Sequence, residues 1–362
     1  MRKVKLLSVN TFTEEWLDAL RVVFESGQLA QGPKVKEFEN RFCEEFWYDH
    51  AVSVNSGTSA LDLAYHLIGI GPGDKVLTPV LTCSATNIPL VHRKADIVFC
   101  DIDRETWTID PESVKKNIRG AKALVVVNLG GLRCADAVFD IAKEEKVPVV
   151  IDAAQSLGIT DVDGDYITYS FQAIKHFTTG DGGMLIVRNV EDEVRAKNLR
   201  WFGIDRDRRM KMNFNFSASN REMCMNMDEP GFKMHMNDID ATMGLVGLRH
   251  WLADLNYRIM LTEEYVKNLP QDLPKVYGGS HWLFGIMLEG RDEGKMDKLK
   301  AEGVENDLVH IRNDVFTPFG GKRQNLPNMD YVEKQYLYLP MHSNIAVDDV
   351  RYVCKVVNEV VK

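Results

Sequence analysis

The sequence predicts an α/β fold with a mostly parallel sheet in the first two thirds of the chain and a smaller α+β unit after it. Short apolar runs alternate with helical patterns up to about residue 188. Because these runs are apolar throughout, helices should cover both faces of the sheet. The length of 362 residues also exceeds what one compact core usually holds. We therefore expect a large domain over residues 30–245 and a small domain over 246–362, with residues 1–29 packed on the small one.

The expected strands of the large domain are short and rich in β-branched residues. They cover residues 51–54, 75–78, 96–101, 123–128, 147–152, 166–171 and 184–188. Helical patterns lie between them over residues 59–68, 85–93, 111–118 and 135–146. The run Gly71-Pro72-Gly73-Asp74 predicts a turn between the first of these helices and the next strand.

The pattern changes after residue 183. Residues 203–232 are rich in Arg, Met, Asn and Ser and have little periodicity, which indicates an irregular excursion over the surface or into a partner subunit. A long helix is expected from about residue 237 to 269. The small domain should follow with a strand and two helices, over residues 282–288, 295–302 and 347–361. Residues 13–26 are typical of an amphipathic helix.

Composition and charge exclude several classes of function. The formal charge is −9 and no long basic run is present, so binding to nucleic acid or an anionic membrane is disfavoured. The N-terminus lacks the apolar stretch of a signal peptide, and no segment reaches the ~20 apolar residues of a membrane helix. The six cysteines are scattered without CxxC spacing, so neither a metal site nor a disulfide framework is expected. A reducing cytoplasm is the simplest location.

A turn of small residues opens the first helix of the large domain. Ser56-Gly57-Thr58-Ser59 follows an expected strand. The N-terminus of a helix offers unpaired N–H groups and the positive end of its dipole, so a phosphate dianion binds there readily. Gly57 permits close approach, and Thr58 or Ser59 can add a hydroxyl. The same residues also fit an ordinary helix cap.

A carboxylate ends one of the apolar strands. Asp152 follows Val149-Val150-Ile151, and catalytic groups of α/β sheets lie at the carboxyl ends of strands. Beside a pyridine ring, this carboxylate would keep the ring nitrogen protonated, and its own pKa should then fall. Gln155, three residues later, is placed to donate to a phenolate oxygen of such a ring. The alternative is that Asp152 caps the next helix.

Lys175 follows the next strand in a loop. Ser170 precedes it by five residues, and Gly180-Asp181-Gly182-Gly183 returns the chain into the following strand. A nucleophilic amine must be neutral, so it needs a partly desolvated site. A surface lysine beside a glycine turn is the alternative. A pyridoxal phosphate site needs a phosphate-binding turn, a carboxylate at the end of a strand and a lysine. This sequence has all three in that order.

These segments resemble a known family. The run SFQAIKHFTTGDGG is similar to the lysine motif of the DegT/DnrJ/EryC1/StrS sugar aminotransferases, and NSGTSAL and IDAAQSLG resemble its phosphate turn and aspartate segment. The resemblance extends to WFGIDRDRR and GFKMHMNDIDATMGL and covers most of the chain. It implies the fold-type I aminotransferase architecture, with a mostly parallel seven-stranded sheet. It also implies a homodimer whose two active sites are shared across the interface.

The resemblance also implies residue roles. Lys175 would be the Schiff-base lysine and proton shuttle, Asp152 the partner of the pyridine nitrogen and Gln155 the neighbour of the phenolate. The phosphate would be held by Gly57, Thr58, Ser59 and Ser170.

Three positions depart from the family pattern. Cys83 stands where many members stack an aromatic ring on the cofactor. Lys233 stands where many have an asparagine that reaches the neighbouring subunit's phosphate. His235 replaces the usual arginine.

The position of the lysine bears on the reaction. One branch of the family has histidine at this position and dehydrates sugars, and His176 is adjacent here. In the family motif the catalytic position lies five residues after the serine, and five residues after Ser170 is Lys175. The resemblance therefore implies amino transfer from glutamate to a nucleotide-linked 4-keto-6-deoxy sugar, giving a 4-amino sugar of the viosamine or perosamine type.

Alternatives remain open. They are a sugar 3-aminotransferase, an aminotransferase acting on a cyclic polyol ketone, a dehydratase of the same fold, a regulatory protein that binds the cofactor without turnover and a structural protein on a degenerate enzyme fold.

A polar run in the small domain is a candidate substrate site. Arg312 is placed to hold a sugar-nucleotide diphosphate with two parallel hydrogen bonds, with His310 near the sugar. A surface loop with a local ion pair fits the same residues.

Overall fold

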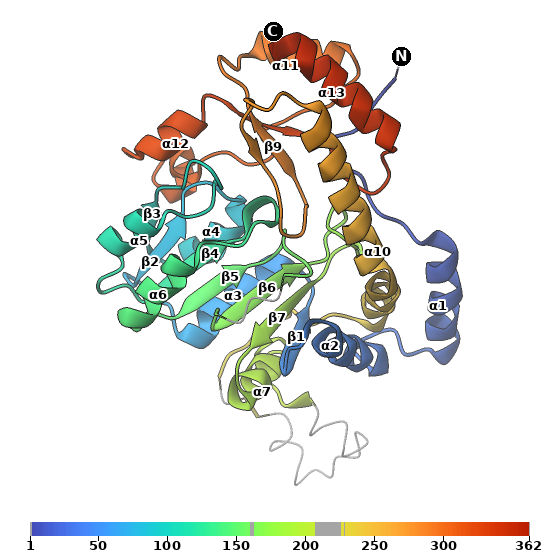
Figure 1. Ribbon diagram of the computed structural model, residues 1–362. Coiled ribbons are helices and arrows are strands. Elements are labelled where there is room, and N and C mark those ends of the chain that lie inside the picture. Colours follow the sequence, from blue (N-terminus) through green and yellow to red (C-terminus); the bar gives the residue numbers. More distant parts are fainter. Residues whose placement is uncertain (1, 160–162, 207–225, 228, 362) are drawn as a thin grey trace.

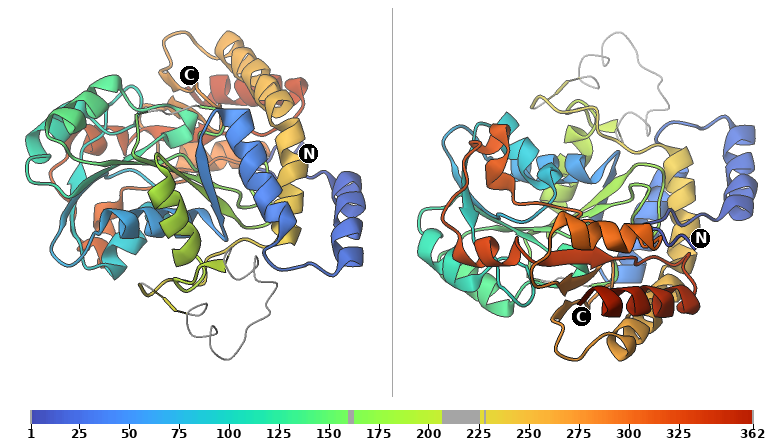
Figure 2. Two further views of the ribbon diagram at one scale, coloured as in Figure 1. Left: turned by 90° about the horizontal axis from the view of Figure 1, so that it is seen from below. Right: turned by 90° about the horizontal axis from the view of Figure 1, so that it is seen from above.

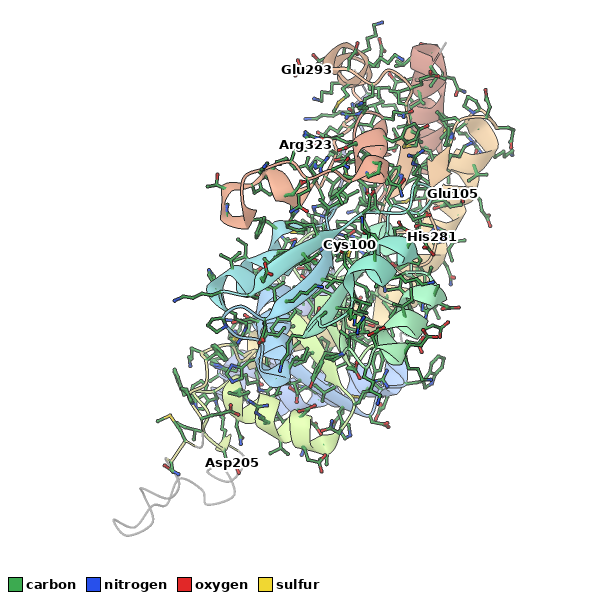
Figure 3. All side chains as sticks on the ribbon, turned by 90° about the vertical axis from the view of Figure 1, so that its left-hand side faces the viewer. Cys100, Glu105, Asp205, His281, Glu293 and Arg323 are labelled. Atoms are coloured by element: carbon green, nitrogen blue, oxygen red, sulfur yellow. The ribbon has the colours of Figure 1, made fainter. Side chains whose placement is uncertain are left out.

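The structure is a computed structural model, and it describes residues 2–159, 163–206, 226–227 and 229–361. A seven-stranded sheet with helices on both faces forms the larger unit, and a three-stranded sheet with its own helices lies above it (Figure 1). In the side view of Figure 3, Glu293 and Arg323 lie in the upper, smaller unit and Cys100 lies at the large sheet.

The large sheet has the strand order β1-β7-β6-β5-β4-β2-β3. Five strands, β2 to β6, are parallel, and β7 pairs antiparallel with both β6 and β1. The expected mostly parallel seven-stranded sheet is therefore confirmed. Its strands are β1 (His50–Val54), β2 (Lys75–Pro79), β3 (Asp96–Cys100), β4 (Ala123–Val127), β5 (Val149–Asp152), β6 (Tyr166–Ser170) and β7 (Gly183–Val187).

Each face of this sheet is buried against its own helices, as the two views of Figure 2 show. One face packs against α2 (Pro33–Phe46), α5 (Pro111–Asn117), α6 (Asp136–Glu144) and the first half of α10 (Asp238–Asn268). The other face packs against α3 (Gly57–Ile68), α4 (Ser84–His92) and α7 (Val190–Leu199). Burial on both faces is why the strands are apolar throughout.

The smaller unit has its own core around an antiparallel sheet of order β10-β9-β8. Its elements are the second half of α10, β8 (Lys275–Val276), β9 (Phe284–Met287), α11 (Glu293–Ala301), α12 (Pro327–Val332), β10 (Tyr336–Leu339) and α13 (Val347–Val361). Short 3-10 turns lie at Leu129–Gly131, Asn313–Val315 and Thr317–Phe319.

Helix α10 joins the two units. It runs unbroken through residues 245 and 246, so the boundary expected there lies inside a helix that contributes to both cores. The N-terminal residues lie against the smaller unit, where Val4 pairs with Val304. Helix α1 (Thr13–Ser26) packs along α10, and the Trp16 indole donates to the Met243 carbonyl at 3.4 Å.

Several elements were not identified from sequence. Helices α2 and α7 are absent from the expected set, as are β8, β10 and α12. Helix α7 buries only Ala196 and Leu199, so its apolar stripe is too narrow for a clear helical period. The irregular excursion expected over residues 203–232 falls mainly on 207–225 and 228, outside the described residues. Within the described residues, no helix is long and apolar enough to cross a membrane.

Candidate active site

A cavity of about 490 Å³ lies at the carboxyl ends of β5 and β6. Both units contribute to its wall. Ser56, Gly57, Thr58, Cys83, Asp152, Gln155, Ser170 and Lys175 come from the large unit, and Trp282, Val309 and His310 come from the smaller one. Leu6 and Leu7 reach it from the N-terminal segment. Catalytic groups gather at this edge in α/β sheets because parallel strands all end there.

The phosphate turn is held by a helix cap and by contact with β6. Ser56 Oγ accepts a hydrogen bond from the Ser59 amide at 3.0 Å and so caps α3. A Cβ on Gly57 would lie 2.8 Å from Ser170 Cβ, so only glycine allows the turn to approach that strand. The amides of Gly57 and Thr58 lie in the first helical turn, where N–H groups have no intrahelical partner.

Ser59 is the one expected phosphate ligand that the structure places elsewhere. Its amide is bonded to Ser56, its hydroxyl donates to Asn55 Oδ1 at 2.7 Å, and it does not line the cavity. Ser56 lines the cavity instead, together with Gly57, Thr58 and Ser170. The sequence could not show which of Ser56 and Ser59 faces the cavity, because the hydrogen bond that caps α3 sets the direction of each side chain.

Asp152 is a buried carboxylate held at both oxygens. It is 5% exposed; Thr86 Oγ1 donates to Oδ2 at 2.8 Å and the Ala154 amide donates to Oδ1 at 3.1 Å. Burial raises its pKa, although these bonds and Lys175 act in the opposite direction. The protein's own groups therefore raise the pKa of Asp152, whereas a fall was expected. That expectation assumed a pyridinium beside the carboxylate. No helix follows within residues 153–159, so the capping alternative for Asp152 is wrong.

Lys175 lies in the turn after β6. Its amide donates to the Gln172 carbonyl at 2.9 Å, and its Nζ lies 4.1 Å from the centroid of the Trp282 ring. Burial lowers the pKa of this amine to about 8, with Asp152 acting in the opposite direction. Roughly a tenth of the amine is therefore neutral at pH 7, far more than for an unperturbed lysine.

The neighbouring His176 faces away from the cavity. It is buried, and its Nε2 donates to the Ser280 carbonyl at 2.9 Å. Burial lowers its pKa to about 3, so this imidazole is neutral. Of this adjacent pair, only Lys175 lines the cavity.

Gln155 and His310 form a pair whose protonation follows from the hydrogen bonds. Gln155 Oε1 accepts from the Gly130 amide at 2.7 Å, so its Nε2 donates, to His310 Nε2 at 2.9 Å. His310 Nε2 is therefore the unprotonated nitrogen, and its Nδ1 carries the hydrogen. Burial lowers the pKa of His310 to about 4, which agrees with a neutral ring.

Arg312 does not take the expected substrate role. It is 1% exposed and is absent from the cavity wall. Its Nε and Nη2 donate to the two carboxylate oxygens of Asp314 at 2.7 and 2.6 Å, and its Nη1 donates to Asp330. The expectation of a diphosphate ligand is wrong because this guanidinium is committed to a buried ion pair.

Comparison with known proteins identifies the family. The sequence profile of the DegT/DnrJ/EryC1/StrS aminotransferase family matches residues 10–358. The chain belongs to this family. Its members depend on pyridoxal phosphate, and the family is one of sugar aminotransferases.

Relatives match over nearly the whole chain. The spore coat polysaccharide biosynthesis protein SpsC of Bacillus subtilis (strain 168) is 32% identical over 96% of this chain and 95% of its own. The crystal structure of the aminotransferase TlmJ from Streptoalloteichus hindustanus superposes with a TM-score of 0.89, at 27% identity over 99% of both chains. The sugar aminotransferase CalS13 from Micromonospora echinospora gives a TM-score of 0.89, at 25% identity over 98% of this chain and 99% of its own. The expected fold-type I architecture is thereby confirmed.

The cavity fits the family's cofactor on the chain's own geometry. The turn at Gly57 is closed so tightly against Ser170 that no side chain fits there, as a phosphate cradle requires. Asp152 is a buried carboxylate that a cation in the cavity would stabilise. The Lys175 amine is tuned toward its neutral, nucleophilic form.

The three departures from the family pattern have clear positions. Cys83 occupies the N-cap position of α4 without a capping hydrogen bond from its side chain, and it lines the cavity. Lys233 does not line the cavity, and its Nζ lies 3.5 Å from the centroid of the Trp201 ring. The next residue, Met234, accepts a hydrogen bond from the Asn55 amide at 2.7 Å. His235 contacts the same Trp201 ring edge to face, with ring centroids 4.3 Å apart.

Sequence reasoning missed several residues of the site. Trp282, Leu6, Leu7 and Thr86 were not identified. No local pattern marks them: Thr86 lies four residues after Thr82, but Thr82 precedes α4, and only the structure shows their hydroxyl oxygens 2.8 Å apart.

Proposed function

We propose that this protein transfers an amino group from glutamate to a nucleotide-linked 4-keto-6-deoxy sugar, giving a 4-amino sugar nucleotide. The observation that carries the proposal is Lys175, which lines the cavity with a pKa of about 8 while His176 faces away. The polysaccharide biosynthesis named for SpsC and the sugar aminotransferase activity named for CalS13 support a sugar acceptor.

In this proposal, three sets of residues hold the cofactor. The amides of Gly57 and Thr58, with the hydroxyl of Ser170, bind the phosphate. Asp152 pairs with the ring nitrogen and keeps it protonated, and its two hydrogen bonds fix the carboxylate in place. When bound, the cofactor supplies a ring that withdraws electrons from the carbon that loses its proton.

Lys175 moves the proton. Its Nζ takes a proton from the Cα of glutamate in the first half-reaction and returns one to the sugar carbon in the second. A pKa near the working pH suits both directions, since the same group must accept and donate. The face of Trp282 lies 4.1 Å from Nζ and favours its cationic form after the proton is taken.

Gln155 and His310 supply neutral hydrogen-bond donors. One N–H of Gln155 is used by His310, and the other is available to the phenolate oxygen of the cofactor. His310 lines the cavity, and in this proposal its Nδ1–H donates to a hydroxyl or carbonyl oxygen of the sugar. Because His310 remains neutral above about pH 4, this donor does not change through the neutral range.

The active site is shared between two copies of the chain in this proposal. Lys233 Nζ rests on Trp201 and takes no part in its own subunit's cavity, as suits a cation that serves the partner's phosphate. A symmetric homodimer would then carry two composite sites.

The test is incubation with glutamate and a panel of 4-keto and 3-keto sugar nucleotides. At least one 4-keto member should yield 2-oxoglutarate and an amine at C4, identified by mass spectrometry and NMR. Turnover of 3-keto members alone would indicate a 3-aminotransferase. Loss of a hydroxyl without a new amine would indicate a dehydratase, and cofactor binding without a glutamate half-reaction would indicate a regulatory protein.

A further inference from the structure

Part of the cavity wall is apolar. Leu6, Leu7, Ile174, Val309 and Trp282 all line the cavity. The four aliphatic residues pack against the one hydrophobic cluster that contains Trp282. We call these five residues the apolar wall.

The N-terminal part of the wall is built into the smaller unit. The Leu6 amide donates to Glu305 Oε2 at 3.2 Å, and the Leu6 carbonyl accepts from the Met341 amide at 3.1 Å. Two residues earlier, the Val4 amide donates to the Gly303 carbonyl at 2.8 Å. The backbone therefore presents Leu6 and Leu7 to the cavity in a fixed position, and Figure 1 shows the N-terminus beside the smaller unit.

The wall adjoins the reacting groups along the chain. Ile174 directly precedes Lys175, and Val309 directly precedes His310. A substrate that reaches the Lys175 amine thus lies beside aliphatic side chains. A hydroxyl pressed against such side chains loses its hydrogen bonds to water without a replacement, whereas a methyl group gains contact.

We propose that the apolar wall receives the deoxygenated carbon of the acceptor sugar, and that Leu6 and Leu7 select a methyl group over a hydroxymethyl group there. This inference rests on the proposed function and deepens it, because it assigns acceptor specificity to a segment more than 160 residues from the lysine. A wall that only closes the cavity, without selecting the acceptor, is the competing outcome of the test.

The test compares the wild type, the double variant Leu6→Ser/Leu7→Ser and the control Val9→Ser. Val9 lies on the same segment, is 39% exposed and does not line the cavity. The probes are a nucleotide-linked 4-amino-4,6-dideoxyhexose and its 6-hydroxy counterpart on the same nucleotide. Each acts as amino donor to the cofactor-loaded enzyme, and the absorbance change is followed in a single turnover. The glutamate half-reaction is measured in parallel.

The wild type and Val9→Ser should prefer the 6-deoxy probe by about tenfold or more, the usual scale of discrimination by an apolar pocket. The double variant should react with the two probes at rates within about threefold of each other, and its rate with the 6-deoxy probe should fall more than its rate with glutamate. Should the serines unfold the chain, Leu6→Ala/Leu7→Ala provides the same comparison, with a smaller loss of preference.

Three results would overturn the inference. They are no preference in the wild type, an undiminished preference in the double variants, and an equal fall in the glutamate and sugar half-reactions. Reaction with glutamate but with neither amino sugar would overturn the proposed function itself, and this inference with it.

Discussion

Replacing Asp152 with asparagine removes the charge that the proposal assigns to the cofactor's ring nitrogen. The side chain keeps its size, and its amide oxygen can still accept one of the two hydrogen bonds that Asp152 receives from Thr86 and Ala154. Unit charges about 4 Å apart at an effective dielectric constant near 20 interact by about 4 kcal/mol. Losing most of that energy in the transition state slows the glutamate half-reaction by about 10²- to 10³-fold.

The variant's stability should not fall with its rate. Burial raises the pKa of Asp152, so the ionised carboxylate opposes folding at neutral pH, above the pKa it has when unfolded. The cofactor-free Asp152→Asn protein should therefore unfold at the same temperature as the wild type or slightly above it. That result would separate a catalytic role from a structural one.

The assay is single-turnover absorbance with glutamate, and thermal unfolding is followed by circular dichroism. Asp110→Asn is a matched control: Asp110 caps α5 by accepting from the Glu112 amide, outside the cavity, and asparagine caps equally well. Its rate should equal that of the wild type. An Asp152→Asn rate within about threefold of wild type, roughly 0.6 kcal/mol of barrier, would refute the electron-withdrawal argument.

Three single residues give further predictions. The purified protein should be yellow, and borohydride should fix pyridoxal phosphate on Lys175, as peptide mass spectrometry reads out. The neutral Lys175 amine is the reactive form, so the rate at which pyridoxal phosphate attaches to cofactor-free protein should fall as the pH drops below about 8. An attachment rate that does not change between about pH 6 and about pH 9 would contradict this prediction. Lys233→Ala should weaken cofactor retention, measured by dialysis, without abolishing the dimer, and an active monomer in light scattering would contradict the shared site. Arg312→Met leaves the buried Asp314 carboxylate without its partner, so the free energy of unfolding should fall by about 3–5 kcal/mol, and an unchanged urea midpoint would refute this.

The sequence was informative where local pattern and strand topology determine position. Asp152 and Lys175 follow adjacent parallel strands, and such strands end at the same edge of a sheet, so their convergence could be predicted. The turn at Gly57 was predictable for a similar reason, since it joins a strand to a helix N-terminus.

Contributions from distant segments could not be predicted. Trp282 and Leu6 reach the cavity only because the smaller unit docks over the sheet, and no local pattern encodes that docking. Arg312 was misinterpreted because the sequence does not show that it is buried; its main partner, Asp314, lies only two residues later, as the alternative of a local ion pair allowed. The second carboxylate partner, Asp330, lies 18 residues later and could not be recognised from the run around Arg312.

The central claim is that Lys175 serves amino transfer to a sugar carbon, and one labelling experiment tests it directly. The cofactor-loaded enzyme is incubated with ¹⁵N-glutamate and a nucleotide-linked 4-keto-6-deoxy sugar, and the product is examined by ¹⁵N NMR. We predict one ¹⁵N amine at C4 for each 2-oxoglutarate formed, and none with Lys175→Ala. Oxygen loss without incorporation of ¹⁵N, or labelling that persists in Lys175→Ala, would contradict the account.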